Sequence, residues 1–523
     1  MLQLWAQHNE HRIPWGKLAE YTDLKLFGGR NISLLLEIYF LRLLEYLFLF
    51  WMFHRSGVSR AQMLTVLGFA LFCIYYPIQI ENFCWGFQTV FVCLPAAACI
   101  AIGAAVLHGC STSTQGSRSW WSWAMAASLC AGIVAETSLA SGVFIWPILL
   151  IVSIIYRTPL KSKLLILYVG AMAVAAYLWG YVSPSQHSNP FSSLRQPVAV
   201  ARYVLAYLAF SWDPKLPDSS AWPTFFQLIA ICAIAVVAVA LVKALLFGPK
   251  TGQLQIFLAC YATFLLIVAA STALGRVSFG VEQATSSRYQ SLALDFWACV
   301  GGILVLWRCG SRTSSSRLVE IQTLMFVLLI ASVPRFTSAA SGAEARQHAL
   351  EEGWRQVTQS PSTAAGVLYP LPIPEAYAYL RFHHLGPPMQ LPLDATGAVT
   401  RPEGLRVNGY RILPPADCEG WLDSVKKVSG KEGEITAAGW AWNAKPAKRP
   451  NRVLLADARG DVMNTTDVNV PRPDVPKAIP HIRDVNTGWV LTTHAQPGAV
   501  VRAFAVSDDS TAVCPLTGTF KLQ

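Results

Sequence analysis

The chain has 523 residues, of which 53% are hydrophobic and 14% are charged, and its formal net charge is +11. Soluble globular proteins carry about 25% charged residues, so this composition excludes an ordinary soluble protein and favours a membrane protein. The positive charge does not indicate nucleic-acid binding, because the sequence has no basic stripe interleaved with exposed aromatic residues.

Apolar segments that could cross a bilayer recur along the first part of the chain, each approaching the roughly 20 residues that a span needs. A further apolar stretch at 197–212 is too short to cross and carries Arg202, so we expect a helix on the outer surface with its aromatic rings at headgroup level. We predict about ten spans, near 31–53, 62–80, 87–108, 119–138, 141–156, 164–182, 223–243, 254–272, 291–308 and 318–334.

Every second loop between these segments is purely basic, and short loops of this kind stay on the cytoplasmic side of a bacterial inner membrane. This pattern places residues 1–30 and everything after about residue 334 on the periplasmic side. An outside N-terminus with no span before it is hard to deliver, so we expect a start codon upstream of Met1 and a further first helix. The basic loop residues are Arg55, Arg60, Arg118, Arg157, Lys161, Lys163, Lys243, Lys250, Arg308, Arg312 and Arg317.

The composition divides the chain into four parts: an outer motif loop with an interfacial helix at 1–30, a transmembrane domain at 31–335, a helical and Pro-rich segment at 336–414, and a final domain at 415–523. In the final domain, short alternating apolar runs separated by Gly, Pro, Asn and Asp predict a small antiparallel β-sandwich. Cys418 and Cys514 lie near its two ends. Because the outer compartment is oxidising, we predict a disulfide between them.

The motif richest in chemistry lies at the N-terminus, where Glu10 is flanked by His8, Asn9, His11 and Arg12. A carboxylate beside imidazoles can act as a general base, and a guanidinium can hold a phosphate. A solvated polar loop would have the same composition, so this alternative stays open. The two histidines lack the HExxH spacing of a helical zinc site, so a metal centre is only weakly indicated.

Two further outer loops have a similar character, at 81–88 and 276–290. Arginines on the outer side run against the orientation rule, and a lipid-linked phosphate would explain them. Neutralisation by Glu81 or Glu282 is the simpler alternative. The candidate substrate-binding residues of these loops are Glu81, Asn82, Gln88, Arg276, Arg288 and Tyr289.

Four motifs taken together resemble a large family of bacterial membrane proteins: QHNEHRI at 7–13, ENFCWGFQ at 81–88, SLASGVFIWP at 138–147 and SSRYQ at 286–290. That family is similar to the GT-C-type glycosyltransferases, multi-span enzymes that move a sugar from a polyprenyl-phosphate carrier. The resemblance covers residues 3–335. The chain departs from the family pattern in lacking the helix that should precede the first motif.

The resemblance implies that Glu10, in the first outer loop, acts as the base or orients the acceptor. It implies that Arg288, with Arg276 and Arg12, binds the donor phosphate. The layout of such a reaction would leave His8, His11 and Tyr289 to orient the substrate. Asn9 and the polar residues of the other two outer loops would contact the substrate. The expected partners are a polyprenyl-phosphate-linked sugar, a glycan, lipid or protein acceptor, and membrane lipid, with no nucleic acid. No cofactor is expected, although a divalent cation could bind Glu10 and the histidines together with the substrate.

The C-terminal domain also resembles small β-domains appended to such transferases, through GWAWNAKPAKRPNRVLLAD, RPDV and TGW. On this interpretation Trp440, Trp442 and Trp489 would bind a glycan. The alternative is that these rings form the core of the domain.

A transporter or flippase for a lipid-linked or small solute is the main competing hypothesis, and a non-catalytic scaffold is a third. Transporters carry ionisable residues within their spans, as Glu37, Arg42, Glu45 and Asp295 do here. The spacing of Arg42 and Glu45 also allows a purely structural ion pair. The sequence shows no internal duplication, which counts against a transporter.

Overall fold

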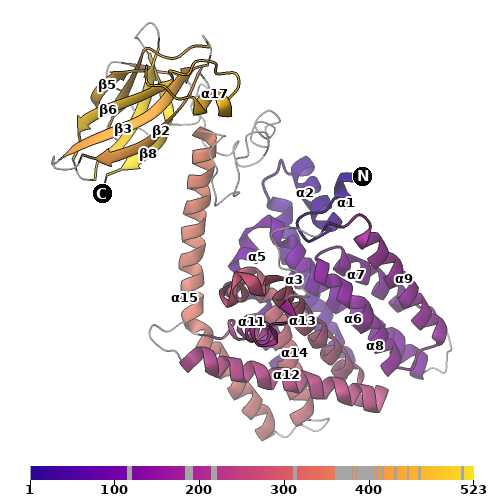
Figure 1. Cartoon of the computed structure of the whole chain (residues 1–523). Helices are drawn as coiled ribbons and strands as arrows, with labels where there is room; N and C mark the ends of the chain where they lie inside the picture. The colour runs from indigo at the N-terminus through magenta and orange to yellow at the C-terminus, as the bar shows by residue number, and fades with distance from the viewer. Residues whose placement is uncertain are drawn as a thin grey trace. The chain divides into compact units, whose positions relative to one another are not determined.

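A computed structural model describes residues 2–114, 120–182, 193–213, 221–309, 315–359 and 410–522, apart from short gaps at 414–416, 429–432, 445–446, 458–460, 497 and 508–511, together with residues 380, 385 and 407. The chain divides into two compact units, Met1–Arg346 and Gln347–Gln523. The first is helical and the second is built around β-strands (Figure 1). The Pro-rich part of the predicted 336–414 segment lies outside the described residues.

Long helices make up the first unit, joined by short helices and single 3₁₀ turns at their ends. The long helices are α2 (Pro14–Leu26), α3 (Ile32–Arg55), α4 (Arg60–Tyr75), α6 (Thr89–Thr114), α7 (Trp123–Glu136), α8 (Ile145–Ile155), α9 (Leu160–Leu178), α11 (Pro197–Ala209), α12 (Ala221–Phe247), α13 (Gln253–Arg276), α14 (Gln290–Cys309) and α15 (Ser315–Gln359). The short elements used below are α1 (Leu2–Trp5), α5 (Ile80–Cys84), η1 (Pro77–Gln79), η2 (Gly86–Gln88), η3 (Ala140–Phe144), η6 (Val281–Thr285) and η7 (Ser287–Tyr289).

Seven stretches of the described helices are long and apolar enough to cross a membrane. They are Arg60–Cys84, Gly86–Thr112, Leu160–Leu178, Phe225–Thr251, Gln253–Phe279, Ser287–Arg308 and Ser316–Leu350. Every predicted span coincides with a helix, but three of these helices are not among the seven. Helix α3 carries Glu37, Arg42 and Glu45, and α7 and α8 are shorter, with 14 and 11 residues. The chain is therefore a multi-pass membrane protein.

Helix α6 lies at the centre of the helical unit, and its neighbours include α3, α7, α8 and α13 (Figure 1). Small residues allow this close packing, since without a hydrophobic driving force helices in lipid associate where their backbones can approach. Ala98 and Ala101 are fully buried. At Gly103 an added Cβ would collide with the ring of Phe48 on α3.

The expected surface position of the 197–212 stretch is wrong in one respect. Its helix, α11, packs against α12, α13 and η6, and Tyr203, Tyr207 and Trp212 are each 0% exposed. Trp212 stacks on Phe69, with ring centroids 5.9 Å apart. The aromatic rings are buried in the protein and do not face lipid headgroups, because neighbouring helices offer them aromatic partners.

In the part of the second unit that the structure describes, there are eight strands and the short helix α17 (Asp474–Ala478). Seven strands form one continuous sheet in the order β5-β4-β7-β8-β2-β3-β6, and β1 pairs with β8. Neighbouring strands are antiparallel except for β2–β8 and β1–β8. The strands are β1 (Arg411–Ile412), β2 (Cys418–Lys427), β3 (Glu434–Asn443), β4 (Arg452–Ala456), β5 (Val462–Asp467), β6 (Gly488–His494), β7 (Val500–Val506) and β8 (Ala512–Lys521).

This sheet differs from the predicted sandwich because β8 pairs with β7 on one side and β2 on the other, so the strands form a single curled sheet. Its two end strands meet. The side chain of Asn464 on β5 donates to the carbonyl of Thr492 on β6 at 3.0 Å, and Thr466 donates to the carbonyl of Val490 at 3.0 Å. These bonds nearly close a barrel, which protects edges that would otherwise pair with other chains.

The predicted disulfide is confirmed: Cys418 on β2 is bonded to Cys514 on β8, with 6.1 Å between the Cα atoms. A disulfide in this unit is consistent with an extracytoplasmic location, since disulfides persist in oxidising compartments.

The three tryptophans of the C-terminal domain are core residues, as the alternative interpretation predicted. Trp489 is 0% exposed, and Trp440 and Trp442 are 7% and 5% exposed. Trp440 and Trp442 pack with Ile482 and Val475 of α17. Buried rings cannot stack on a sugar, so these three residues do not form a glycan-binding surface.

Replacing both disulfide cysteines by Ser is expected to destabilise the β-domain by about 4 kcal/mol, because the bond closes a long loop whose unfolded ensemble it restricts. Limited proteolysis of the full chain in lipid vesicles should show faster cleavage within residues 410–522. The control is Cys130→Ser, which changes an exposed free cysteine of α7. Equal cleavage rates for the double variant and this control would contradict the prediction.

Candidate functional site

Loops that the charge pattern assigns to the outside meet one another at one end of the helical unit. Glu10 of the N-terminal segment forms an ion pair with Arg276, at the end of α13. The backbone N–H of Ala140 in η3 donates to His11 at 3.1 Å. The side chain of Gln7 donates to the carbonyl of Val182, just after α9, at 2.6 Å.

The basic loops contact one another in the same way. The Gln253 side chain, before α13, donates to the Ser56 hydroxyl, after α3, at 3.4 Å. The Ser162 hydroxyl, at the start of α9, donates to the carbonyl of Trp120 at 3.0 Å. Segments far apart in sequence thus group by their predicted side, which agrees with an alternating path through a membrane.

Glu10 is the centre of the first polar group. Its Oε1 is paired with Nη2 of Arg276 and lies 3.5 Å from Nε2 of His11. Because Nδ1 of His11 accepts the Ala140 N–H, the neutral imidazole carries its proton on Nε2, facing Glu10. The carboxylate is half-buried, at 19% exposure of its side chain. The predicted base is therefore held between a cation and an imidazole N–H.

A tight turn presents Glu10. The backbone N–H of His8 donates to the carbonyl of His11 at 2.7 Å, and the reverse bond is 2.9 Å. Asn9 has φ of 49°, in the left-handed region that Asn adopts more readily than most residues. The Tyr181 hydroxyl donates to the carbonyl of Glu10 at 3.2 Å. Backbone hydrogen bonds thus fix the position of Glu10, and Asn9 supplies the left-handed residue that the turn requires.

The His8 ring lies 5.4 Å from the ring of Phe87 in η2, which connects the N-terminal motif to the 81–88 loop. Desolvation, and next the charge of Lys17, lower the pKa of His8, while Glu10 opposes them. The imidazole is therefore neutral at neutral pH.

Arg12 faces the protein. It is 6% exposed, and Nε and both terminal nitrogens of its guanidinium donate to the carbonyls of Tyr177, Trp5 and Trp179. These bonds attach the N-terminal segment to the end of α9. The geometry favours a positioning role for Arg12.

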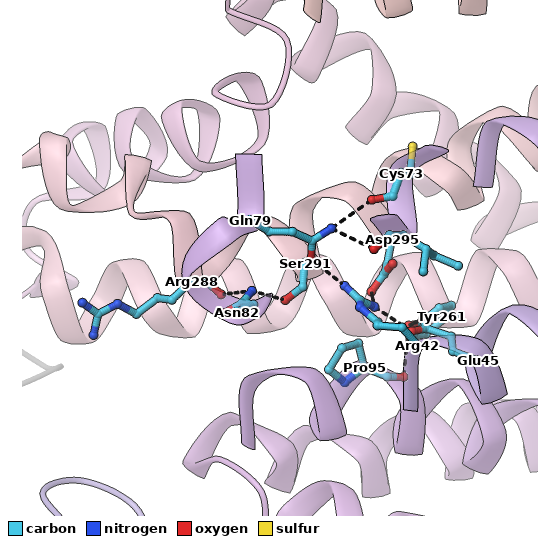
Figure 2. A network of polar contacts seen from close by, with 11 residues as sticks. Arg42, Glu45, Cys73, Gln79, Asn82, Pro95, Tyr261, Arg288, Ser291 and Asp295 are labelled. Atoms are coloured by element: carbon cyan, nitrogen blue, oxygen red, sulfur yellow. Dashed lines mark hydrogen bonds and ion pairs between the residues drawn. The ribbon is translucent and has the colours of Figure 1, made fainter. Parts of the chain in front are cut away.

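Glu81 and Arg288 form the second polar group. Their side chains are 3.3 Å apart, and the Arg288 side chain is 35% exposed. Buried Asn82 donates to the carbonyl of Arg288 at 3.1 Å and to the Ser291 hydroxyl at 3.2 Å (Figure 2). The Ser287 hydroxyl donates to the carbonyl of Ile78 at 2.7 Å. Loops 81–88 and 286–291 are therefore joined, and Arg288 still reaches the surface.

Both outer arginines thus have acidic partners. The Glu81–Arg288 pair is the one that the neutralisation alternative named, whereas Arg276 pairs with Glu10 and the pairing with Glu282 is not seen among the described residues.

Two predicted residues lie deeper. Tyr289 is 5% exposed, and its ring stacks on that of Tyr207, with centroids 5.5 Å apart. Gln88 is 0% exposed, and neither polar atom of its amide has a hydrogen-bond partner among the described residues. The structure therefore places these two side chains beneath the surface on which Glu10 and Arg288 lie.

A third polar group lies inside the helical unit. Nη1 of Arg42 on α3 is 2.6 Å from Oε2 of Glu45 and 2.8 Å from Oδ2 of Asp295 on α14 (Figure 2). The Tyr261 hydroxyl donates to Glu45 at 2.7 Å, and Arg42 donates to Gln79 at 3.1 Å. The predicted Arg42–Glu45 pair is confirmed. The Arg42–Asp295 pair was not predicted from the sequence, although opposite charges in two apolar segments are a signal for such a contact.

Among the residues that the structure describes, no group of three or more His, Cys, Asp or Glu side chains is placed to hold a metal ion. Comparison of the chain with models of known protein families, with curated proteins and with solved structures finds no match. The functional argument therefore depends on the site itself.

Proposed function

We propose that this protein is a membrane glycosyltransferase of the GT-C type, with about ten spans, that moves a sugar from a polyprenyl-phosphate carrier to an acceptor at the outer face of the inner membrane. The observation that carries the proposal is the placement of Glu10 against Arg276 and His11. Glu81 with Arg288 lies at the same end of the helical unit. A base and two cations are what this transfer needs.

The reaction follows from these groups. The acceptor hydroxyl attacks the anomeric carbon of the sugar and forms the new C–O bond. The bond from that carbon to the phosphate oxygen breaks, and its electron pair leaves on the phosphate. Glu10 takes the proton of the hydroxyl. Arg276 and Arg288 stabilise the departing phosphate, because a cation is worth most where negative charge develops.

The ion pair of Glu10 with Arg276 suits this sequence of events. A phosphate that binds Arg276 competes with Glu10 for the guanidinium. Once released from Arg276, the Glu10 carboxylate is a stronger base, since a nearby cation had stabilised its charged form. Donor binding thus prepares the base.

The direct test uses the full chain in lipid vesicles, with polyprenyl phosphate carrying radiolabelled glucose or mannose. Transfer of label to an added glycan or lipid acceptor, or release of sugar to water, with free polyprenyl phosphate formed in equal amount supports the proposal. If neither donor loses its sugar in the presence of correctly folded protein, with the disulfide formed, we would abandon this function.

A transporter for a lipid-linked or small solute is the second candidate, because ionisable residues buried within spans usually mark a transport path. Arg42, Glu45 and Asp295 are such residues. Transport moves the labelled carrier between leaflets and leaves the sugar bond intact, so the same vesicles distinguish the two candidates.

Arg288→Ala is expected to lower the transfer rate about 100-fold, the effect of losing one group that stabilises developing negative charge. Arg288→Lys should recover part of the rate, since a point charge remains. The matched control is Arg30→Ala, an exposed cation just before α3. Equal rates in the two alanine variants would remove Arg288 from phosphate binding.

A further inference from the structure

The buried charge cluster, formed by Arg42, Glu45 and Asp295, contains one cation and two acids. The exposures of these residues are 0%, 0% and 2%. If both acids were ionised, the cluster would carry a net negative charge inside the membrane-spanning unit. Charges in that environment are retained only when they are balanced.

No second cation balances the cluster within the described part of the chain. The other titratable side chains that are close enough to interact electrostatically with the cluster lie on α4, α6, α11, α13 and α14. They are Tyr75, Cys73, Cys99, Tyr207, Tyr261 and Cys299. All are phenols or thiols, which are uncharged at neutral pH in their ordinary state. The imbalance therefore has to be removed at one of the two carboxyl groups.

The hydrogen bonds distinguish the two acids. Both oxygens of Glu45 accept a bond, Oε2 from Arg42 at 2.6 Å and Oε1 from Tyr261 at 2.7 Å. For Asp295, Oδ2 accepts from Arg42 at 2.8 Å, but Oδ1 is buried without a partner among the described residues. Two accepted bonds favour the ionised form at Glu45, whereas Asp295 lies within hydrogen-bonding reach of the Glu45 carboxylate and has an unused oxygen that can carry a proton.

A small cavity lies against the cluster. Glu45, Asp295 and Tyr261 line a cavity of about 10 Å³, whose other walls include Leu49 and Phe53. That volume is at the lower limit of the space that one water molecule needs. The apolar walls offer too few oxygens for a metal cation, which takes six or more oxygen ligands in the case of Ca²⁺.

We propose that the buried charge cluster is a proton-binding site, which holds a single proton on Oδ1 of Asp295 at neutral pH. With that proton the cluster is neutral: Arg42 and Glu45 form the ion pair, and Asp295 is an uncharged acid that accepts from Arg42 and donates into the cavity. This site is separate from the proposed transferase site, since none of its three residues belongs to the outer loops.

Infrared difference spectroscopy tests the proposal on the full chain in lipid vesicles, with aspartate carbon-13-labelled at its carboxyl group. The wild type should show the C=O band of one protonated aspartic acid at neutral pH, shifted by the label and by deuterium oxide, and lost as the pH is raised. The label separates Asp295 from buried glutamates such as Glu136. Asp295→Asn should lack the band, while Asp213→Asn, an acid outside the cluster, should keep it.

Absence of a labelled acid band in the wild type at neutral pH would overturn the proposal. So would persistence of that band in Asp295→Asn. Because the first measurement uses the unaltered protein, it gives an answer even if the variant does not fold. Asn has almost the shape of the protonated acid, and Arg42 keeps Glu45 as its partner, so the variant is expected to fold.

Discussion

Glu10→Gln is expected to lower the sugar-transfer rate by roughly 100- to 10,000-fold, the contribution that a positioned general base makes. Gln has nearly the same shape and can still accept a hydrogen bond from Arg276, so the turn between His8 and His11 should persist. It cannot take a proton from the acceptor hydroxyl. The measurement is the initial rate of transfer from polyprenyl-phosphate sugar by the full chain in vesicles, together with its pH dependence.

The matched control is Glu20→Gln, the same change on α2, at a half-buried residue outside the site. It should keep the wild-type rate and the same yield of membrane-inserted protein as Glu10→Gln. The acid limb of the pH–rate profile, which reports ionisation of the base, should disappear in Glu10→Gln alone. A wild-type rate in Glu10→Gln would remove Glu10 from the mechanism, and a slower rate with an unchanged profile would assign it a structural role.

The sequence predicted on which side of the membrane the outer site lies, but it did not predict which of its residues contact one another. Alternating basic loops placed Glu10 and Arg276 on one side of a membrane, and the structure brings them into contact across 266 residues of chain. Charge patterning is a local property of each loop, so it can assign a side. It cannot say which cation meets which acid, because that depends on how the helices pack.

Arg12 shows why a residue's role could not be read from its type. In the sequence it is one more cation beside Glu10, and a phosphate ligand is a reasonable hypothesis. In the structure three carbonyls at α1 and at the end of α9 occupy its guanidinium. A helix end leaves carbonyls without partners, but which side chain supplies the missing donors depends on tertiary structure.

The β-domain shows the same limit. Alternating runs identified the strands, and the positions of Cys418 and Cys514 predicted their bond. The pattern could not distinguish a sandwich from a curled sheet, because both have the same alternation along each strand. The difference lies in β8, which pairs with strands on both of its sides.

Removal of both acids from the buried charge cluster, in Glu45→Gln/Asp295→Asn, is expected to cost about 3–5 kcal/mol, as for a buried charge that loses its partner. Arg42 would then be an unpaired cation among membrane-spanning helices, and a guanidinium does not deprotonate in proteins. Since whole domains are stable by only about 5–15 kcal/mol, this cost is a large fraction of the total, and both the yield and the unfolding temperature should fall. The yield of monodisperse protein and its unfolding temperature in detergent measure this effect.

The single variants and a triple variant make the test specific. Asp295→Asn should change the unfolding temperature little, since it replaces an acid proposed to be uncharged. Glu45→Gln should cost more, because Asp295 must then give up its proton to serve as the partner of Arg42. Adding Arg42→Gln to the double variant should recover stability, since a neutral polar cluster costs less than an unpaired charge. Costs that simply add, with no recovery in the triple variant, would show that the three side chains act by packing and not by charge.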